Sequence, residues 1–120
     1  MKSKEFVPAA EFAGRVVDML EAIQQNLLNR AKEFRDANTR VINSKDEFYD
    51  FFTPKYTSKP EIHGGFALAH WSGAREVEEQ IKSDLKVTIR CIPFADSAES
   101  GTCIFSGAPS PQRVVWAKSY

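Results

Sequence analysis

Few residues in this sequence have the types and spacing that metal binding or catalysis requires. Cys91 and Cys103 are the only cysteines, and His63 and His70 are the only histidines. A structural zinc site needs four ligands, usually in two close pairs, and two cysteines 12 positions apart match that pattern weakly. Cys91 falls on the apolar side of an alternating segment, so we expect a small core residue there. We expect His70 to be packed and hydrogen-bonded and His63 to be solvated; a ligand or catalytic role for His70 is the alternative.

Acidic side chains gather at one place, where Asp46, Glu47 and Asp50 could pair carboxylates for acid–base catalysis. They follow Ser44, however, and a serine with a glutamate three positions later forms a capping box at a helix start. Negative charge in the first turn also complements the helix dipole. The pair Gly64-Gly65 precedes a strand rather than a helix, which does not suit a phosphate-binding loop. The sequence therefore predicts no catalytic centre in this segment.

The overall composition is that of a soluble globular domain, with 42% hydrophobic and 27% charged residues in a length of 120. Sixteen basic and sixteen acidic side chains give zero formal net charge, which argues against independent binding to nucleic acid. No apolar run approaches the roughly 18 residues of a membrane span. No signal-type stretch follows the opening Met1-Lys2-Ser3-Lys4-Glu5. We therefore expect a cytoplasmic protein with reduced cysteines and no membrane contact.

A long amphipathic helix is predicted from about residue 9 to residue 35. Its apolar residues recur at spacings of four and three, which is typical of one helix face. The stripe consists of Phe12, Val16, Leu20, Ile23, Leu27, Ala31 and Phe34. This pattern allows two interpretations: a long helix in the core of the domain, or a connector whose spare face packs on another domain.

Shorter helices and strands follow the long helix. Strands are predicted at 39–42, 66–71, 86–92, 102–105 and 113–117. Helices are predicted after Ser44 and over 74–85, the second capped by Ser72. The last two strands are expected to pair as a hairpin with a long turn. We therefore predict an α/β domain of the two-layer α+β kind: a long N-terminal helix, then β-α-β-α-β-β-β, with helices covering one face of a small mixed sheet.

Three stretches of the second half carry a more specific pattern. They are residues 65–73 with the acidic helix 75–82, residues 88–94, and the run from Ser106-Gly107-Ala108-Pro109-Ser110 through 112–120. These stretches resemble the C-terminal domain of prolyl-tRNA synthetases of the eukaryotic/archaeal type, which are class II aminoacyl-tRNA synthetases. The helix around 23–31 is similar to the one that links that family's anticodon-binding domain to this one. The resemblance covers most of residues 7–120.

The resemblance implies a division of roles along the chain. Residues 1–38 would be the linker helix that joins the anticodon-binding domain, and residues 39–120 would be the C-terminal domain. In the family, the full-length cytoplasmic ligase attaches proline to tRNA(Pro) at the expense of ATP, with Mg²⁺, and is a homodimer. This segment would have no catalytic residue, would pack against the catalytic domain, and would support the active site through its last residue, Tyr120. A free-standing RNA- or protein-binding module of the same two-layer fold is the alternative.

The resemblance also bears on zinc, which many family members hold in this domain with four cysteines. In this sequence those positions are Ser72, Val77, Cys103 and Ser106, so a single thiol remains. Two serines and a valine cannot supply the thiolates of a closed tetrahedral site. We therefore expect a degenerate metal site without zinc, and no cofactor in this segment. ATP and Mg²⁺ would bind elsewhere in the full-length enzyme.

Overall fold

The computed structural model describes residues 4–55, 58, 63–94 and 98–119, and the chain forms two separate compact units. The first unit, residues 1–37, contains helix α1 (Ala9–Ala37). No described residue of α1 is buried, and most of the predicted apolar stripe is exposed. None of the helices in the described ranges is both long and apolar enough to cross a membrane.

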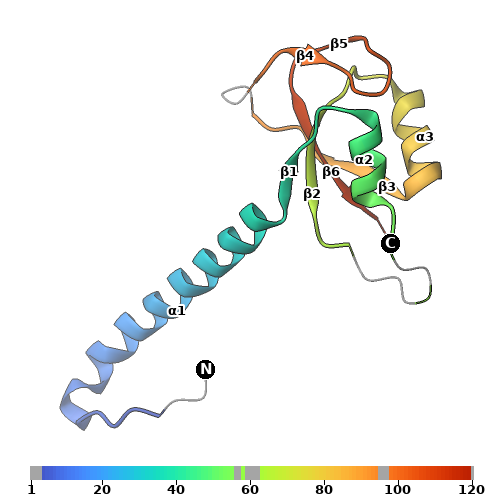
Figure 1. The fold of residues 1–120 in the computed structure, drawn as a ribbon. Coiled ribbons are helices and arrows are strands. Elements are labelled where there is room, and N and C mark those ends of the chain that lie inside the picture. The colour runs from blue at the N-terminus through green and yellow to red at the C-terminus, as the bar shows by residue number, and fades with distance from the viewer. Residues whose placement is uncertain (1–3, 56–57, 59–62, 95–97, 120) are drawn as a thin grey trace. The chain divides into compact units, whose positions relative to one another are not determined.

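A four-stranded mixed sheet forms the centre of the second unit, residues 38–120 (Figure 1). Its strand order is β1-β2-β6-β3. The strands are β1 (Thr39–Val41), β2 (Phe66–His70), β6 (Arg113–Lys118) and β3 (Val87–Cys91). β1 runs parallel to β2, whereas β6 is antiparallel to both of its neighbours. The expected small mixed sheet is confirmed, and the last strand lies inside it rather than at an edge.

The predicted pairing of the last two strands is wrong. β4 (Gly101–Thr102) is short and pairs with β5 (Pro109–Ser110) in a separate two-stranded ladder, whereas β6 pairs with β2 and β3. The chain turns after Thr102, where the Gly107 amide donates to the Cys103 carbonyl at 2.9 Å. Gly107 has a φ of 72°, a conformation that suits glycine because it lacks a Cβ. A tight turn therefore replaces the strand expected at 103–105.

Two helices, α2 (Lys45–Phe52) and α3 (Arg75–Leu85), connect strands of the sheet. The predicted N-cap of α2 is confirmed, because the Ser44 hydroxyl accepts a hydrogen bond from the Glu47 amide at 3.2 Å. The predicted N-cap of α3 is wrong. Ala74 is its N-cap residue and makes no side-chain cap bond, while the Ser72 hydroxyl bonds elsewhere.

The core lies between one face of the sheet and the two helices. Its buried cluster consists of Ile42, Phe48, Phe52, Ala67, Ala69, Ile81, Val87, Val114 and Trp116. Trp116 is fully buried, and its ring centroid lies 5.5 Å from that of Phe48 and 5.6 Å from that of Phe105. Because α2 and α3 both contribute to this cluster, they cover the same face, as predicted (Figure 1).

Candidate functional site

Two loops meet at the predicted degenerate metal site. The first, residues 71–74, follows β2, and the second, residues 103–107, follows β4; together they are called the loop pair. The hydroxyl oxygens of Ser72 and Ser106 lie 3.4 Å apart and are hydrogen-bonded to each other. The second loop is also tied to the sheet, because the Ile104 amide donates to the His70 carbonyl at 3.3 Å. Two of the four predicted positions are thus in direct contact across the loops.

Cys103 is buried, and its thiol receives hydrogen bonds from both loops. Burial by itself raises the pKa of the thiol, but the hydrogen bonds outweigh burial. Their donors are the Ser106 hydroxyl and the backbone amides of Ser106, Phe105 and Ser72. The net result is a Cys103 pKa below its ordinary value, because these donors stabilise the thiolate. Two of the predicted positions, Ser72 and Ser106, therefore act on the sulfur atom of a third, Cys103.

The residues present do not fit a structural zinc ion. The donors around Cys103 would suit a thiolate ligand, but Ser72 and Ser106 offer hydroxyls that are bonded to each other. Val77 is half-buried in α3 and packs against the core cluster, so its position offers a hydrocarbon. Nor do any three His, Cys, Asp or Glu residues of the described part of the chain gather where they could hold a metal ion. A closed zinc site needs four ligands, and one is present here.

The remaining cysteine and one histidine lie in surroundings that differ from those predicted. Cys91 is exposed rather than buried, because the register of β3 against β6 shifts between Ile89 and Cys91. His63 is half-buried rather than solvated. Its ring centroid lies 4.7 Å from that of Phe51 and 5.1 Å from that of Phe52. Neither a register shift nor an aromatic contact made across a loop leaves a local signal in the sequence.

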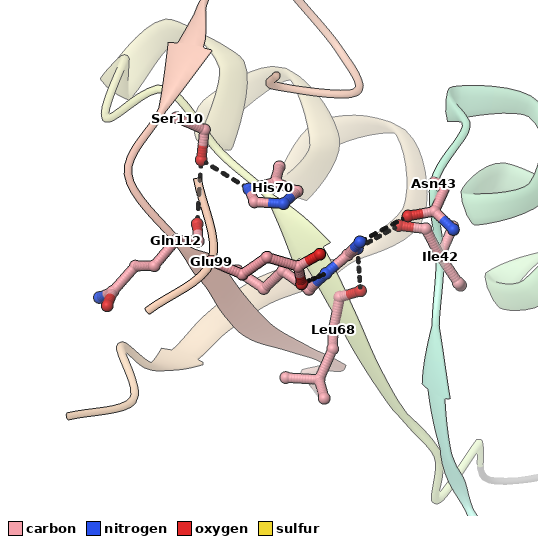
Figure 2. Close-up of polar contacts among 8 residues, drawn as sticks. Ile42, Asn43, Leu68, His70, Glu99, Ser110 and Gln112 are labelled. Atoms are coloured by element: carbon pink, nitrogen blue, oxygen red, sulfur yellow. Dashed lines mark hydrogen bonds and ion pairs between the residues drawn. The ribbon is translucent and has the colours of Figure 1, made fainter. Parts of the chain in front are cut away.

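A buried polar network, shown in Figure 2, was not evident from the sequence. His70 is buried, and its Nδ1 lies 3.0 Å from the Ser110 hydroxyl oxygen. The same hydroxyl donates to the Gln112 carbonyl at 2.9 Å, so it must accept from His70, which places the ring proton on Nδ1. Gly101 lies against the other side of the ring, where a Cβ would come within 2.5 Å of Nε2. The expectation of a packed, hydrogen-bonded His70 is confirmed.

Arg113 is the cross-strand partner of His70 in β6, and its guanidinium joins several segments, whose accepting residues are labelled in Figure 2. It donates to the Glu99 carboxylate at 2.9 Å and to the Asn43 side-chain oxygen at 2.7 Å. It also donates to the carbonyls of Ile42 and Leu68, at 3.2 and 3.5 Å. The Arg113 side chain is 16% exposed, and its hydrogen bond and charge hold the pKa of Glu99 below its usual range. Arg113 thus clamps β1, β2 and the loop before β4 onto β6.

The end of β6 is held by groups from α3, β3 and α2. The Ser119 amide and hydroxyl both donate to the Lys86 carbonyl, at 2.7 and 3.0 Å. Arg90 donates to the Lys118 carbonyl at 2.7 Å, and the Lys118 ammonium donates to the Phe52 carbonyl at 3.3 Å. Lys86 ends α3 with a φ of 56°, which aims its carbonyl toward β6. Tyr120, the predicted active-site-supporting residue, lies outside the described residues.

The acidic residues of α2 lie where the capping interpretation places them. Asp46, Glu47 and Asp50 are exposed, and the first two stand in the first turn. A different pair, between α2 and α3, has shifted pKa values: the Tyr49 hydroxyl donates to the Asp84 carboxylate at 2.7 Å. Burial first, and then the hydrogen bond and charge of Asp84, raise the pKa of Tyr49 to about 12. The pair links α2 to α3. The contacts of Tyr49 and Asp84 described above include no metal-binding or nucleophilic group.

Comparison with known proteins gives a consistent set of relatives. The family profile described as "Prolyl-tRNA synthetase, C-terminal" matches residues 56–120. "Proline--tRNA ligase 2" of Anaeromyxobacter dehalogenans is 55% identical over 123 residues, covering 99% of this chain and 24% of the relative. "Proline--tRNA ligase" of Protochlamydia amoebophila is 43% identical over 120 residues, with the same two shares. The chain spans about a quarter of the length of these curated relatives.

Solved structures give the same picture for the fold. A prolyl-tRNA synthetase from Cryptosporidium parvum, complexed with halofuginone and AMPPNP, matches with a TM-score of 0.78 at 21% identity. The match covers 98% of this chain and 24% of that one. A structure of the enzyme from the same organism with L-proline and AMP matches with a TM-score of 0.77 at 22% identity. At this level of identity the likeness shows the fold.

Proposed function

The chain belongs to the prolyl-tRNA synthetase family, whose C-terminal domain it matches, and from this premise we propose that it supports the ATP-dependent attachment of proline to tRNA(Pro) without catalysing it. The match of residues 56–120 to the family's C-terminal profile is the observation that carries the proposal. Relatives about four times as long have room for the catalytic and anticodon-binding domains that this chain lacks the length to hold. The chain is thus a segment of a ligase, and its own contribution is structural.

The two compact units suggest how the segment is organised. Residues 1–38 are assigned to a linker helix that joins the anticodon-binding domain, and residues 39–120 to the C-terminal domain. The division between the units, after Ala37, supports this assignment. So does the exposed apolar stripe of α1, because a long apolar stripe on a surface usually marks a contact with another part of a protein. The catalytic and anticodon-binding domains of the same enzyme are therefore the proposed partners.

Substrate binding is assigned to the rest of the enzyme. ATP, Mg²⁺ and tRNA(Pro) would bind to the other domains, and the contacts of the cytoplasmic homodimer would also lie there. The zero formal net charge of this segment supports that assignment for tRNA, because binding to a phosphate backbone needs an excess of basic side chains.

Tyr120 is the residue proposed to act on the active site. The support for this role comes from its neighbours, since four hydrogen bonds hold Lys118 and Ser119. A residue that follows a fixed strand can be presented to a neighbouring domain at little entropic cost. We propose that Tyr120 contacts the catalytic domain and helps to order its proline site.

The test is proline activation by the full-length enzyme, measured as proline-dependent ATP–pyrophosphate exchange. Tyr120→Ala is expected to lower the exchange rate by about tenfold, which corresponds to roughly 1.4 kcal/mol. Tyr120→Phe separates the contribution of the ring from that of the hydroxyl. Val41→Ala, which changes an exposed residue of β1, serves as the control and should keep the parent rate. Exchange by Tyr120→Ala at the parent rate would refute the role of Tyr120 and leave the domain as a structural support.

A further inference from the structure

Three of the four positions that hold zinc ligands in the family carry no thiol in this chain. We propose that hydrogen bonds among Ser72, Cys103 and Ser106 hold the loop pair together in place of a metal ion. This inference goes beyond the proposed function, because it concerns how the domain folds and not what the full-length enzyme does. The domain would then be stable without metal, and Ser72 and Ser106 would keep the spacing of two neighbouring metal ligands while lacking their chemistry.

The two loops are spaced like two ligands of one metal ion. Two ligands of a tetrahedral zinc ion, each about 2.0–2.3 Å from the metal, lie about 3.3–3.8 Å from each other. The hydroxyl oxygens of Ser72 and Ser106 are 3.4 Å apart. The loops are therefore held at the separation that a metal would impose, but by a hydrogen bond between two neutral groups.

Cys103 is buried between the two loops, and donors from both loops act on its thiol. The second loop is independently shaped by its own backbone, because the Cys103 amide donates to the Ala108 carbonyl at 2.8 Å and the Gly107 amide returns to Cys103. The Ala108 amide also donates to the Ser106 hydroxyl oxygen, at 3.4 Å. The turn needs no metal to form.

The fourth of the zinc positions is occupied by Val77. Val77 packs against the same buried cluster that holds the sheet and helices together. A hydrocarbon there contributes by burial rather than by coordination, and a thiolate at that place would instead need a metal partner. The site thus combines the hydrogen bond between Ser72 and Ser106 with the packing of Val77 on the buried cluster.

The first test is the metal content and metal dependence of residues 1–120 purified without chelator. The proposal predicts far less than one zinc per chain by elemental analysis, and the same urea midpoint with and without EDTA. One zinc per chain, together with a lower midpoint in EDTA, would overturn it. Weakly held zinc whose removal leaves the midpoint unchanged would support it.

The second test measures the coupling between the two serines. Ser72→Ala and Ser106→Ala should each lower the urea midpoint, and the double variant should lower it by less than the sum, because both remove the same bond. Ser83→Ala, an exposed serine on α3, is the matched control and should leave the midpoint unchanged. Strictly additive effects of the two loop substitutions would show that the serines do not hold the loops together, which contradicts the proposal.

The third test restores the missing ligands. A triple variant with Ser72→Cys, Val77→Cys and Ser106→Cys should bind Co²⁺ with the absorption bands of a tetrahedral thiolate site, whereas the parent chain should not. Thiolate-to-cobalt bands in the parent chain would overturn the proposal. A triple variant that keeps its circular dichroism spectrum but binds no Co²⁺ would refute the retained geometry. If the triple variant does not fold, the metal content of the parent chain still decides the proposal.

Discussion

The two units of the chain use apolar residues in opposite ways. In α1, a helix of 29 residues, a regular apolar stripe runs from Phe12 to Phe34, and no described residue of the helix is buried. In the second unit, shorter and less regular segments bury a cluster around Trp116 and Phe48. The comparison shows that a strong amphipathic pattern indicates a helix but does not identify what covers its apolar face. For α1, the proposed linker role would supply that cover from other domains of the enzyme.

The largest effect is expected from removing the centre of the buried cluster. Trp116→Ala should lower the free energy of unfolding by about 3–5 kcal/mol, because it removes a fully buried ring that contacts Phe48 and Phe105. Leu27→Ala, which changes an exposed residue of the α1 stripe, should change it by less than about 0.5 kcal/mol. Urea denaturation followed by circular dichroism measures both. Equal losses for the two variants would show that α1 is packed as tightly as the core.

The next effect concerns the Arg113 clamp. Arg113→Met keeps much of the volume but leaves the carbonyls of Ile42 and Leu68 without this donor, so a loss of about 2–3 kcal/mol is expected. Arg75→Met is the control, because Arg75 forms an exposed pair with Glu79 and should contribute little.

The loss of stability in Arg113→Met should also depend on pH. The pKa of Glu99 in the folded state lies below its ordinary value. The ionised Glu99 carboxylate therefore contributes to the free energy of unfolding at pH values above the ordinary pKa, and this contribution is lost as the pH falls through the lowered pKa. The stability gap between parent and Arg113→Met should therefore narrow in acid. A gap that stays constant down to the lowest pH would contradict a role for the Glu99 charge.

A smaller effect is expected at the pair between α2 and α3. Tyr49→Phe removes the hydrogen bond to Asp84 and should cost about 1 kcal/mol or less, because the pair is partly exposed. The pKa of Tyr49 in the folded state is raised from 10.0 to about 12. The protonated hydroxyl therefore makes its full contribution to the free energy of unfolding below pH 10, and this contribution is lost as the pH rises toward 12. Phenolate absorbance during an alkaline titration measures this, with the Phe variant as reference. Ionisation of Tyr49 at its ordinary pKa would refute the contact.

The smallest effect is expected from removing α1 altogether. Residues 38–120 alone should keep the free energy of unfolding of the 120-residue chain to within about 0.5 kcal/mol, because no described residue of α1 is buried. Trp71 and Trp116 both lie in the second unit and report its unfolding by fluorescence. A loss of several kcal/mol on truncation would show that the helix and the sheet unit are one cooperative structure.

Local signals in the sequence were sufficient for part of this fold. Ser44 and Glu47 stand at the spacing of a capping box, and the cap forms as predicted. The alternation of apolar and polar residues predicted β3, and the order of elements predicted a mixed sheet with helices on one face. Each of these features depends on residues that are close in the sequence, so a single sequence carries the information.

Features that depend on distant partners were not predicted. The register shift that exposes Cys91 arises from the pairing of β3 with β6, which no local pattern specifies. The place of β6 inside the sheet and the clamp made by Arg113 likewise join segments far apart in the chain. At the loop pair, the positions followed from the family resemblance, but the donors around Cys103 required the structure.

We propose that this chain supports the prolyl-tRNA synthetase reaction and contains no catalytic centre of its own. The most direct measurement is proline-dependent ATP–pyrophosphate exchange by the purified 120-residue chain beside the full-length enzyme at the same molar concentration. Background exchange is expected for the chain and clear exchange for the full-length enzyme. Exchange by the chain that scales with its concentration and persists through a second purification would contradict the claim.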